Sequence, residues 1–306
     1  MMLHIIIFSF NRALQLDTLL DSLVQNWKSP EYFISVIYNT SDDDYERGYQ
    51  IVQEKFSPFP VAFCKESSVA DKPQIDTFFT WDNVKRYLKY PCLRHPKSNF
   101  RSLLLRVIKD NPSEFLMFLT DDAMFIKEVC ISQHIFSWLG DKSESRQFSL
   151  RIGERLNNQP RGIIQKEKEY LKWNMYDAPM MTNWGYNFSV DAHIYNKDVI
   201  TRILDQLWFI NPNTLEDPVC RAIRKRKMMG EAMAYDEPRV LSFPINMVQS
   251  VVQNESLGVD CKMLNQLYLT GYTLKYPVPE KISHFQNYPD YLRLFKENKE
   301  TNLKIK

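Results

Sequence analysis

An uninterrupted apolar run at residues 115–119 ends abruptly at two adjacent carboxylates, Asp121 and Asp122. A run of this length between polar residues is typical of a strand buried on both faces of a mostly parallel sheet. Acidic residues at the carboxyl end of such a strand lie where open α/β sheets bind ligands. Neighbouring anions repel each other, so the pair predicts a nearby cation, such as a divalent metal that also binds phosphate. A turn in which both aspartates cap the next segment is the alternative.

Strand and helix patterns alternate through the first 64 residues. Strands are predicted at 3–10, 32–38 and 60–64, and helices at 12–27 and 45–56. This order is typical of a doubly wound, Rossmann-like α/β fold with helices flanking a mostly parallel central sheet. The turn at residues 9–12 contains no glycine, so both the GxGxxG fingerprint and the P-loop are absent from it.

Composition excludes several classes of protein. A net charge of +2 over 306 residues gives no electrostatic case for nucleic-acid binding. Five scattered cysteines without a CxxC pair argue against a disulfide framework and for a reducing compartment. No apolar run approaches the roughly 20 residues that span a bilayer, and no basic leader is present. We therefore expect a cytoplasmic protein.

The second half is expected to form helices at 129–139, 196–207, 217–229 and 261–268, and strands at 147–152, 239–243 and 246–252. Glu216 and Asp217 are predicted to form an acidic turn, with Asp217 as the N-cap before Pro218. The tail from residue 290 is predicted to fray. The tyrosine-rich pattern around Tyr288 and Tyr291 leaves two alternatives, a closing helix packed on the protein or contact with the inner face of a membrane.

Neither repeats nor a linker divide the chain, which predicts one domain over residues 1–306. Within it we expect two functional halves, at 1–125 and 126–289, and a tail at 290–306.

Together these segments resemble a glycosyltransferase of the GT-A fold, close to the family-2-like enzymes that build bacterial surface polysaccharides. The similarity is carried by FSFNRALQLDTLLDSL near the start, FLTDDAMF, Trp-Gly-Tyr-Asn-Phe at 184–188, Glu216-Asp217 and PINMVQ at 244–249. It implies a GT-A sheet with a smaller acceptor-side subregion, in which residues 1–125 form the nucleotide-sugar-binding half and residues 126–289 the acceptor and catalytic half. One departure stands out: Thr120 precedes the two aspartates where the family's DXD motif has a first carboxylate.

The resemblance implies a nucleoside-diphosphate sugar as donor, with a UDP-sugar favoured, and a saccharide or lipid-linked acceptor. It implies that the donor contacts Ser9, Asn11, Arg12, Tyr38, Asn39 and Asp121. A divalent metal, Mn²⁺ or Mg²⁺, would be bound by Asp122 first and by Asp121 and His284 in addition. A packing or surface role is the alternative for His284.

For the acceptor side, the resemblance implies contacts from Trp184, Gly185, Tyr186 and Glu216, with Asp217 as catalytic base. An inverting transfer needs such a base to deprotonate the acceptor hydroxyl. A core aromatic cluster is the alternative for 184–186, and a helix cap is the alternative for Asp217.

Two other functions stay open. A sugar nucleotidyltransferase uses a related sheet, but residues 9–14 lack the glycine-rich, basic loop of those enzymes. A binding protein with a decayed transferase site is the second, and Thr120 in the acidic motif is what keeps it open.

Overall fold

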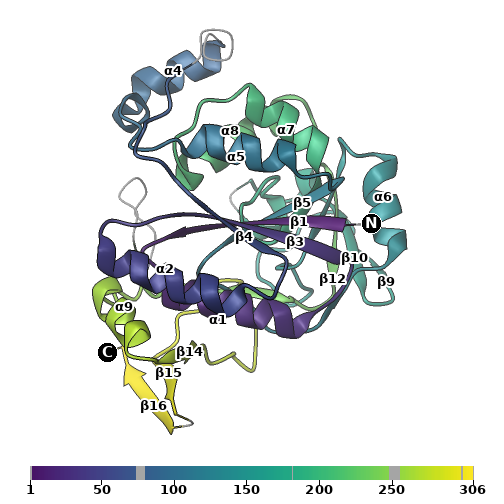
Figure 1. Ribbon diagram of the computed structural model, residues 1–306. Coiled ribbons are helices and arrows are strands. Elements are labelled where there is room, and N and C mark those ends of the chain that lie inside the picture. The colour runs from purple at the N-terminus through teal and green to yellow at the C-terminus, as the bar shows by residue number, and fades with distance from the viewer. Residues whose placement is uncertain (1, 74–79, 181, 248–255, 298, 306) are drawn as a thin grey trace.

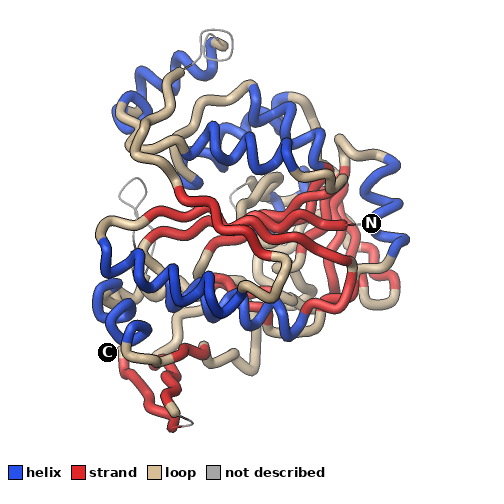
Figure 2. Tube along the Cα trace, viewed as in Figure 1, coloured by secondary structure: helices blue, strands red, loops and turns tan. Residues whose placement is uncertain are grey.

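The computed structural model describes residues 2–73, 80–180, 182–247, 256–297 and 299–305, and these form three layers. A nine-stranded sheet lies between helices on both of its faces (Figures 1 and 2). Its strand order is β4-β3-β1-β5-β11-β8-β12-β10-β9. In that order the strands are Val61–Lys65, Glu31–Asn39, Met2–Phe10, Phe115–Thr120, His193–Asn196, Arg146–Ser149, Glu231–Tyr235, Tyr170–Asn174 and Gln165–Glu167.

The helices form two layers on opposite faces of the sheet (Figure 1). One layer holds α1 (Ala13–Asn26), α2 (Asp43–Phe56) and, at its edge, α9 (Cys261–Leu269). The other holds α5 (Phe100–Asp110), α7 (Lys197–Asp205) and α8 (Pro212–Lys225). Two shorter helices, α4 (Trp81–Lys89) and α6 (Gln133–Asp141), lie at the periphery.

Three small sheets complete the strands. They pair β2 (Trp27–Ser29) with β7 (Val129–Cys130), β13 (Val240–Ser242) with β6 (Ala123–Phe125), and β14 (Thr273–Lys275) with β15 (Tyr291–Lys296) and β16 (Lys299–Lys304).

Strand β1 shows why the central strands read as continuous apolar runs. Its odd-numbered residues, among them Leu3, Ile5 and Ile7, pack into the core under α1 and α2. Its even-numbered residues Ile6 and Phe8 pack into the core under α5, α7 and α8. Both faces are therefore apolar, and β1 pairs in parallel with β3 and β5. The predicted fold class, a mostly parallel α/β sheet flanked by helices, is confirmed.

Strand β11 runs antiparallel to β5, and this reversal shapes the edge of the sheet at the carboxyl end of β5. Ile194 pairs with Met117, and the Ala192 amide donates to the Phe118 carbonyl at 2.8 Å. Because β11 is reversed, the loop that precedes it lies beside the carboxyl end of β5. Strand β8 also pairs antiparallel with β11, so its carboxyl end returns to the same edge.

Helix α8 begins earlier than predicted. Asn211 is its N-cap, Pro212 occupies its first turn, and Thr214 completes a capping box. The preference for a capping residue followed by proline, which predicted a cap at Asp217 before Pro218, is satisfied six residues upstream by Asn211 and Pro212. Asp217 therefore lies inside the helix, which corrects the predicted acidic turn.

The C-terminal segment is a β-hairpin, neither a frayed tail nor a closing helix. Strands β15 and β16 pair along six residues each, and β14 pairs with β15 on its other side. Leu292 and Leu294 are buried while the residues between and around them are more exposed. Burial at every second residue is the period of a strand, so the helical spacing read from Tyr288 and Tyr291 was misleading.

Two further predictions need correction, and one of them falls partly outside the described residues. The helix expected at 129–139 begins only at Gln133, because Val129 and Cys130 pair with β2. Asn246 and Met247 are not in a strand, and residues 248–252 of that predicted strand lie outside the described residues.

Across the described ranges, no helix combines the length and the apolar character needed to cross a membrane. The proposed division into two halves stays a prediction, and the central sheet takes strands from both of them.

Candidate active site

The two turns that follow β1 and β5 are joined by a buried ion pair. Arg12 Nη1 lies 2.8 Å from Asp121 Oδ1, and the side chains are 10% and 4% exposed. The second oxygen, Asp121 Oδ2, accepts from Ser9 Oγ at 2.8 Å and from the Phe10 amide at 3.3 Å. Burial raises the pKa of the Asp121 carboxyl, and the Arg12 guanidinium opposes this. Both oxygens of Asp121 are therefore engaged within the protein.

This arrangement changes the roles predicted for Ser9 and Asp121. The Ser9 hydroxyl bonds to Asp121 and to the Tyr49 hydroxyl, so it supports the turn and is 7% exposed. The sequence predicted a metal beside Asp121, but the cation next to it in the structure is Arg12. A buried carboxylate needs a neighbouring cation, and the guanidinium supplies it. Arg12 also donates to the Asn246 carbonyl at 2.5 Å, which brings residue 246 to the same place.

The turn residues Asn11 and Asn39 lie side by side at the ends of β1 and β3. Asn11 has a positive φ of 56°, and its side chain exchanges two hydrogen bonds of 2.9 Å with Ser41. The Asn39 side chain accepts from the Thr40 amide at 2.8 Å and is half-buried. These turns are positioned as a nucleotide-binding edge requires.

Tyr38 does not face that edge. Its ring stacks on Tyr49 with centroids 4.5 Å apart, meets the edge of Phe63, and the residue is 5% exposed. The predicted contact of Tyr38 with the donor does not fit this burial. The sequence could not show it, because the Tyr49 partner comes from the next helix.

Asp122 is the carboxylate at this edge that stays partly open. Thr120 Oγ1 donates to its Oδ1 at 2.7 Å, and Arg12 Nη1 lies 3.7 Å from its Oδ2. The side chain is 17% exposed, and the Phe243 amide holds the Asp122 carbonyl at 2.8 Å. Thr120, which stands where the DXD motif has its first carboxylate, thus orients the side chain of Asp122.

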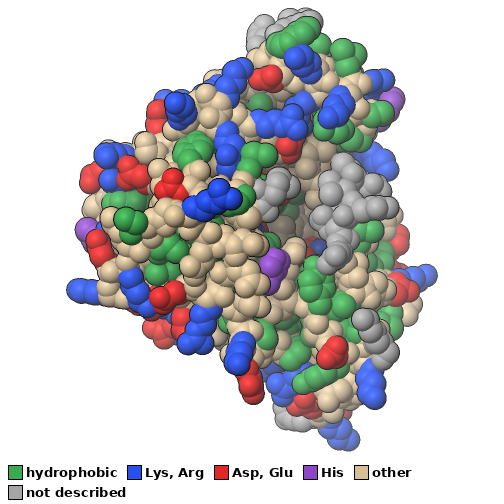
Figure 3. Space-filling view, turned by 180° about the vertical axis from the view of Figure 1, so that it is seen from behind, with side chains coloured by type: hydrophobic (Ala, Val, Ile, Leu, Met, Phe, Trp, Pro, Cys, Tyr) green, Lys and Arg blue, Asp and Glu red, His purple; other side chains and the backbone are tan. Residues whose placement is uncertain are grey.

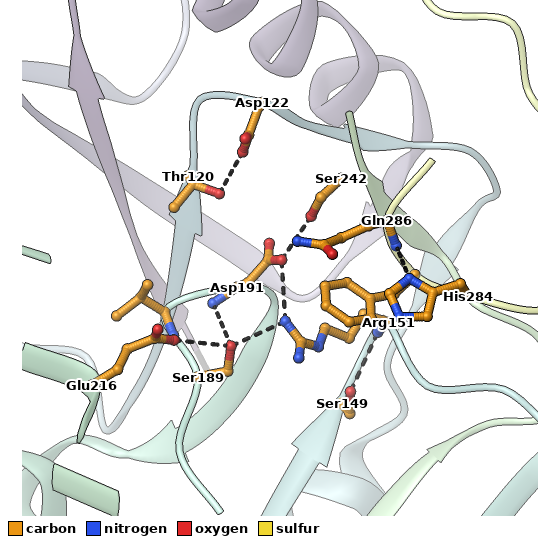
Figure 4. Close-up of polar contacts among 12 residues, drawn as sticks. Thr120, Asp122, Ser149, Arg151, Ser189, Asp191, Glu216, Ser242, His284 and Gln286 are labelled. Atoms are coloured by element: carbon orange, nitrogen blue, oxygen red, sulfur yellow. Dashed lines mark hydrogen bonds and ion pairs between the residues drawn. The ribbon is translucent and has the colours of Figure 1, made fainter. Parts of the chain in front are cut away.

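A second polar cluster lies beside Asp122 (Figure 4). Arg151 Nη1 lies 3.1 Å from Asp191 Oδ2, and Ser242 Oγ donates to the same oxygen at 2.7 Å. Burial raises the pKa of Asp191, Arg151 and Ser242 oppose the shift, and the Asp122 carboxylate adds to it. These residues come from the ends of β8 and β13 and from the loop before β11, which meet at one edge of the sheet.

Glu216 closes the cluster from helix α8. Its Oε1 accepts from the Val190 amide at 2.8 Å and from Ser189 Oγ at 3.3 Å. Burial raises the pKa of the Glu216 carboxyl, the Val190 amide and Arg151 lower it, and the nearby Asp191 raises it again. Figure 4 shows Asp191 between Asp122 and Glu216, so three carboxylates follow one another across the site.

Asp217, the next residue, is not brought into this cluster. Its side chain is 52% exposed and pairs with Arg221 at 2.9 Å, one helical turn along α8. Successive side chains on a helix point about 100° apart, so Glu216 and Asp217 face different surroundings.

The predicted acceptor-side aromatics are mainly core residues. Trp184 is fully buried, packs edge-on against Trp173 with centroids 5.0 Å apart, and donates to the Asn157 carbonyl at 3.1 Å. A Cβ on Gly185 would lie 2.3 Å from the Pro179 carbonyl oxygen, so close packing requires glycine there. Neither residue offers a surface to an acceptor. Tyr186 is half-buried close to Glu216, and burial raises the pKa of its hydroxyl.

His284 is connected to the cluster of Arg151, Asp191 and Ser242 through its neighbour Phe285. Its Nδ1 accepts from the Gln286 amide at 3.1 Å, and its ring stacks on Phe285. The Arg151 guanidinium lies 3.9 Å from the Phe285 ring centroid. The Ser242 amide donates to the Phe285 carbonyl at 2.9 Å, which fixes this segment beside the acidic residues.

Some side chains of the site could serve as ligands for Mn²⁺ or Mg²⁺. Such ions are held by one or two carboxylates together with phosphate oxygens and waters. Asp122 fits because it is partly open, and exposed His284 lies in a segment beside the cluster, whereas Asp121 does not fit because both its oxygens are engaged. No group of three or more potential ligands that could hold a metal occurs within the described ranges.

Four residues of the site were missed by the sequence reading, namely Arg151, Ser189, Asp191 and Ser242. Arg151, Ser189 and Asp191 lie in loops beside short strands and Ser242 ends one, and the sequence did not reveal the directions of these strands. The face opposite the one in Figure 1 is hollowed near its centre, and a histidine side chain lies at the edge of the hollow (Figure 3).

The structure is a three-layer α/β fold with carboxylates at one edge of its central sheet, as predicted from the sequence. In sequence the chain is similar to the bifunctional glycosyltransferase pgtA of Dictyostelium discoideum, with 22% identity over 224 residues. The match covers 66% of this chain and 25% of pgtA, so the chain spans about a quarter of that relative. The predicted resemblance to a glycosyltransferase is confirmed by this similarity. No family model matches the chain.

Among solved structures the chain is similar to TarS of S. aureus. Residues 1–349 of TarS in complex with UDP-GlcNAc give a TM-score of 0.49 at 13% identity, covering 88% of this chain and 66% of that one. The same fragment without that ligand gives a TM-score of 0.46 at 14% identity, covering 79% and 60%.

Proposed function

We propose that this chain is a glycosyltransferase that moves a sugar from a nucleoside-diphosphate sugar to a hydroxyl of a saccharide or lipid-linked acceptor. The observation that carries the proposal is the line of carboxylates Asp122, Asp191 and Glu216 at the ligand-binding edge of a nucleotide-type sheet. The sequence similarity to a glycosyltransferase supports it. A UDP-sugar is the donor that the resemblance favours.

Asp122, with His284 as a further ligand, would hold Mn²⁺ or Mg²⁺ against the diphosphate. A bound divalent ion would neutralise the negative charge that develops on the leaving diphosphate. Thr120 fixes one oxygen of Asp122 and leaves the other toward Arg12, which is itself a cation at this edge. Arg12 and the turns at Asn11 and Asn39 would contact the nucleotide.

The transfer is proposed to be inverting, with a carboxylate as general base. The base takes the proton of the acceptor hydroxyl while that oxygen bonds to the anomeric carbon and the bond to the diphosphate breaks. The sequence resemblance proposes Asp217, but the geometry favours Glu216. Glu216 lies within the cluster and burial raises its pKa, whereas Asp217 pairs with Arg221 at the surface.

The binding protein with a decayed site is the second candidate. It is favoured by one observation: Arg12 already neutralises Asp121, which leaves Asp122 as the open member of the acidic pair. A cytoplasmic location, with the exposed Tyr288 and Tyr291 touching the membrane that carries a lipid-linked acceptor, stays a proposal.

The test is a thermal-shift screen of nucleoside diphosphates and their sugars with and without Mn²⁺. A ligand that binds the native state raises its stability with the logarithm of its concentration over the dissociation constant. We expect a shift selective for one base, larger with Mn²⁺, and loss of the manganese effect in Asp122→Asn. Asp198→Asn, an exposed aspartate on α7, is the matched control. No shift with any nucleotide would contradict both the transferase and a nucleotide-binding decayed site.

A further inference from the structure

Asp191 carries an oxygen that the protein leaves without a hydrogen bond. Its Oδ2 accepts from Arg151 and Ser242, but its Oδ1 is buried and has no partner in the described parts of the chain. A buried acceptor without a partner costs free energy, and such atoms are rare in native proteins. The Asp191 side chain as a whole is 12% exposed.

The orientation of Asp191 is fixed from several sides. Its amide donates to Ser189 Oγ at 3.2 Å, and Arg151 Nη1 donates to the same hydroxyl at 3.1 Å. Arg151 in turn packs on the Phe285 ring. The carboxylate is therefore held in place before any ligand arrives, as a recognition group should be.

The position of Asp191 indicates which part of a ligand it would meet. It lies between Asp122, on the side proposed for the diphosphate, and Glu216, the favoured base (Figure 4). In an inverting transfer the leaving group and the base act on opposite faces of the sugar ring. A group between them faces the ring itself.

We infer that Asp191 Oδ1 accepts a hydrogen bond from a hydroxyl of the transferred sugar and that the site selects a neutral sugar. The inference rests on the proposed function. A sugar hydroxyl supplies the missing donor. A uronic acid would place a fourth carboxylate beside Asp122, Asp191 and Glu216, where Arg151 is already paired, and like charges repel in a partly buried site.

The experiment titrates the full chain with UDP, UDP-glucose, UDP-galactose, UDP-N-acetylglucosamine and UDP-glucuronate in Mn²⁺ by calorimetry. Guanosine diphosphate and its mannose conjugate are titrated in the same way. In Asp191→Asn we expect about a tenfold or larger loss of affinity for the neutral nucleotide sugars and no change for the nucleoside diphosphate alone. In the unchanged protein we expect UDP-glucuronate to bind at least about tenfold more weakly than UDP-glucose. In Asp191→Asn this difference in affinity should be smaller.

Asp198→Asn, at an exposed position in the first turn of α7, serves as the control and should change the affinity neither for the nucleoside diphosphate nor for its sugars. If Asp191→Asn does not fold, Asp191→Glu keeps the charge but moves the oxygen, and the same selective loss is expected. An equal loss for the diphosphate and its sugars would make Asp191 a scaffold for Arg151 and overturn the inference, as would unchanged sugar affinity. If the unchanged protein binds no nucleotide, the proposed function fails and the inference falls with it.

Discussion

Arg12 and Asp121 are 109 residues apart in the chain and form a buried ion pair 2.8 Å long at the carboxyl ends of β1 and β5. The pair joins the first turn of the fold to the strand that carries the acidic motif. It also separates two neighbouring aspartates by function, because Asp121 holds the scaffold together while Asp122 stays open to a ligand.

Removal of the Asp121 carboxylate should destabilise the whole fold. Asp121→Ala leaves Arg12 charged and buried without its partner, and we expect a loss of about 3–5 kcal/mol in the free energy of unfolding. Urea denaturation measures it. Asp122→Asn is the matched control and should cost less than about 1 kcal/mol, since that side chain is partly exposed. Equal losses in the two variants would contradict the separate roles.

The choice between Glu216 and Asp217 as base has a direct test. Glu216→Gln should lower the rate of sugar transfer about 10²- to 10⁴-fold while nucleotide binding is kept. Asp217→Asn should leave the rate near that of the unchanged protein, because its side chain pairs with Arg221 at the surface. Because the pKa of Glu216 is raised, the rate should rise with pH through that pKa as the base loses its proton. A large loss of rate in Asp217→Asn, with little loss in Glu216→Gln, would instead identify Asp217 as the base.

Trp184 should behave as a core residue. Trp184→Ala empties a fully buried position and should cost about 3–5 kcal/mol in the free energy of unfolding. Trp81, which is 70% exposed on α4, is the control, and Trp81→Ala should change stability by about 0.5 kcal/mol or less. The milder Trp184→Phe should leave acceptor affinity intact. A weaker acceptor affinity at unchanged stability would instead support a role in acceptor binding.

A buried histidine should make the fold sensitive to acid. Burial, with a smaller contribution from Lys197, lowers the pKa of His4 to about 4 from an ordinary value of 6.5. Between these values the unfolded chain binds a proton that the folded protein does not, so stability is lost as pH falls from 6.5 to 4. The loss from this residue amounts to about 3 kcal/mol.

The measurement for His4 is urea unfolding at pH 7 and pH 4.5. His4→Gln can keep a hydrogen bond to Ser35 and should lose less stability between these values than the unchanged protein. His134→Gln, at an exposed position on α6, should leave the difference unchanged. Since buried carboxyls such as Asp17 have raised pKa values and act in the opposite sense, the difference between variants is what identifies His4.

The sequence by itself determined the core sheet and the place of its ligand edge. Alternating apolar runs and amphipathic helices are local patterns, so β1, β3, β4 and β5, with α1 and α2, follow from them. The adjacent aspartates at the end of an apolar strand likewise marked the edge, and Asn11 marked its first turn.

Tertiary structure decided which side chains meet there. Arg12 neutralises Asp121, Tyr49 covers Tyr38, and the reversal of β11 brings Asp191 beside Asp122; each depends on a partner from a distant segment. The directions of short strands and the faces of a helix leave little trace in a local pattern. Burial at the assembled edge, which no single segment encodes, separated Glu216 from Asp217.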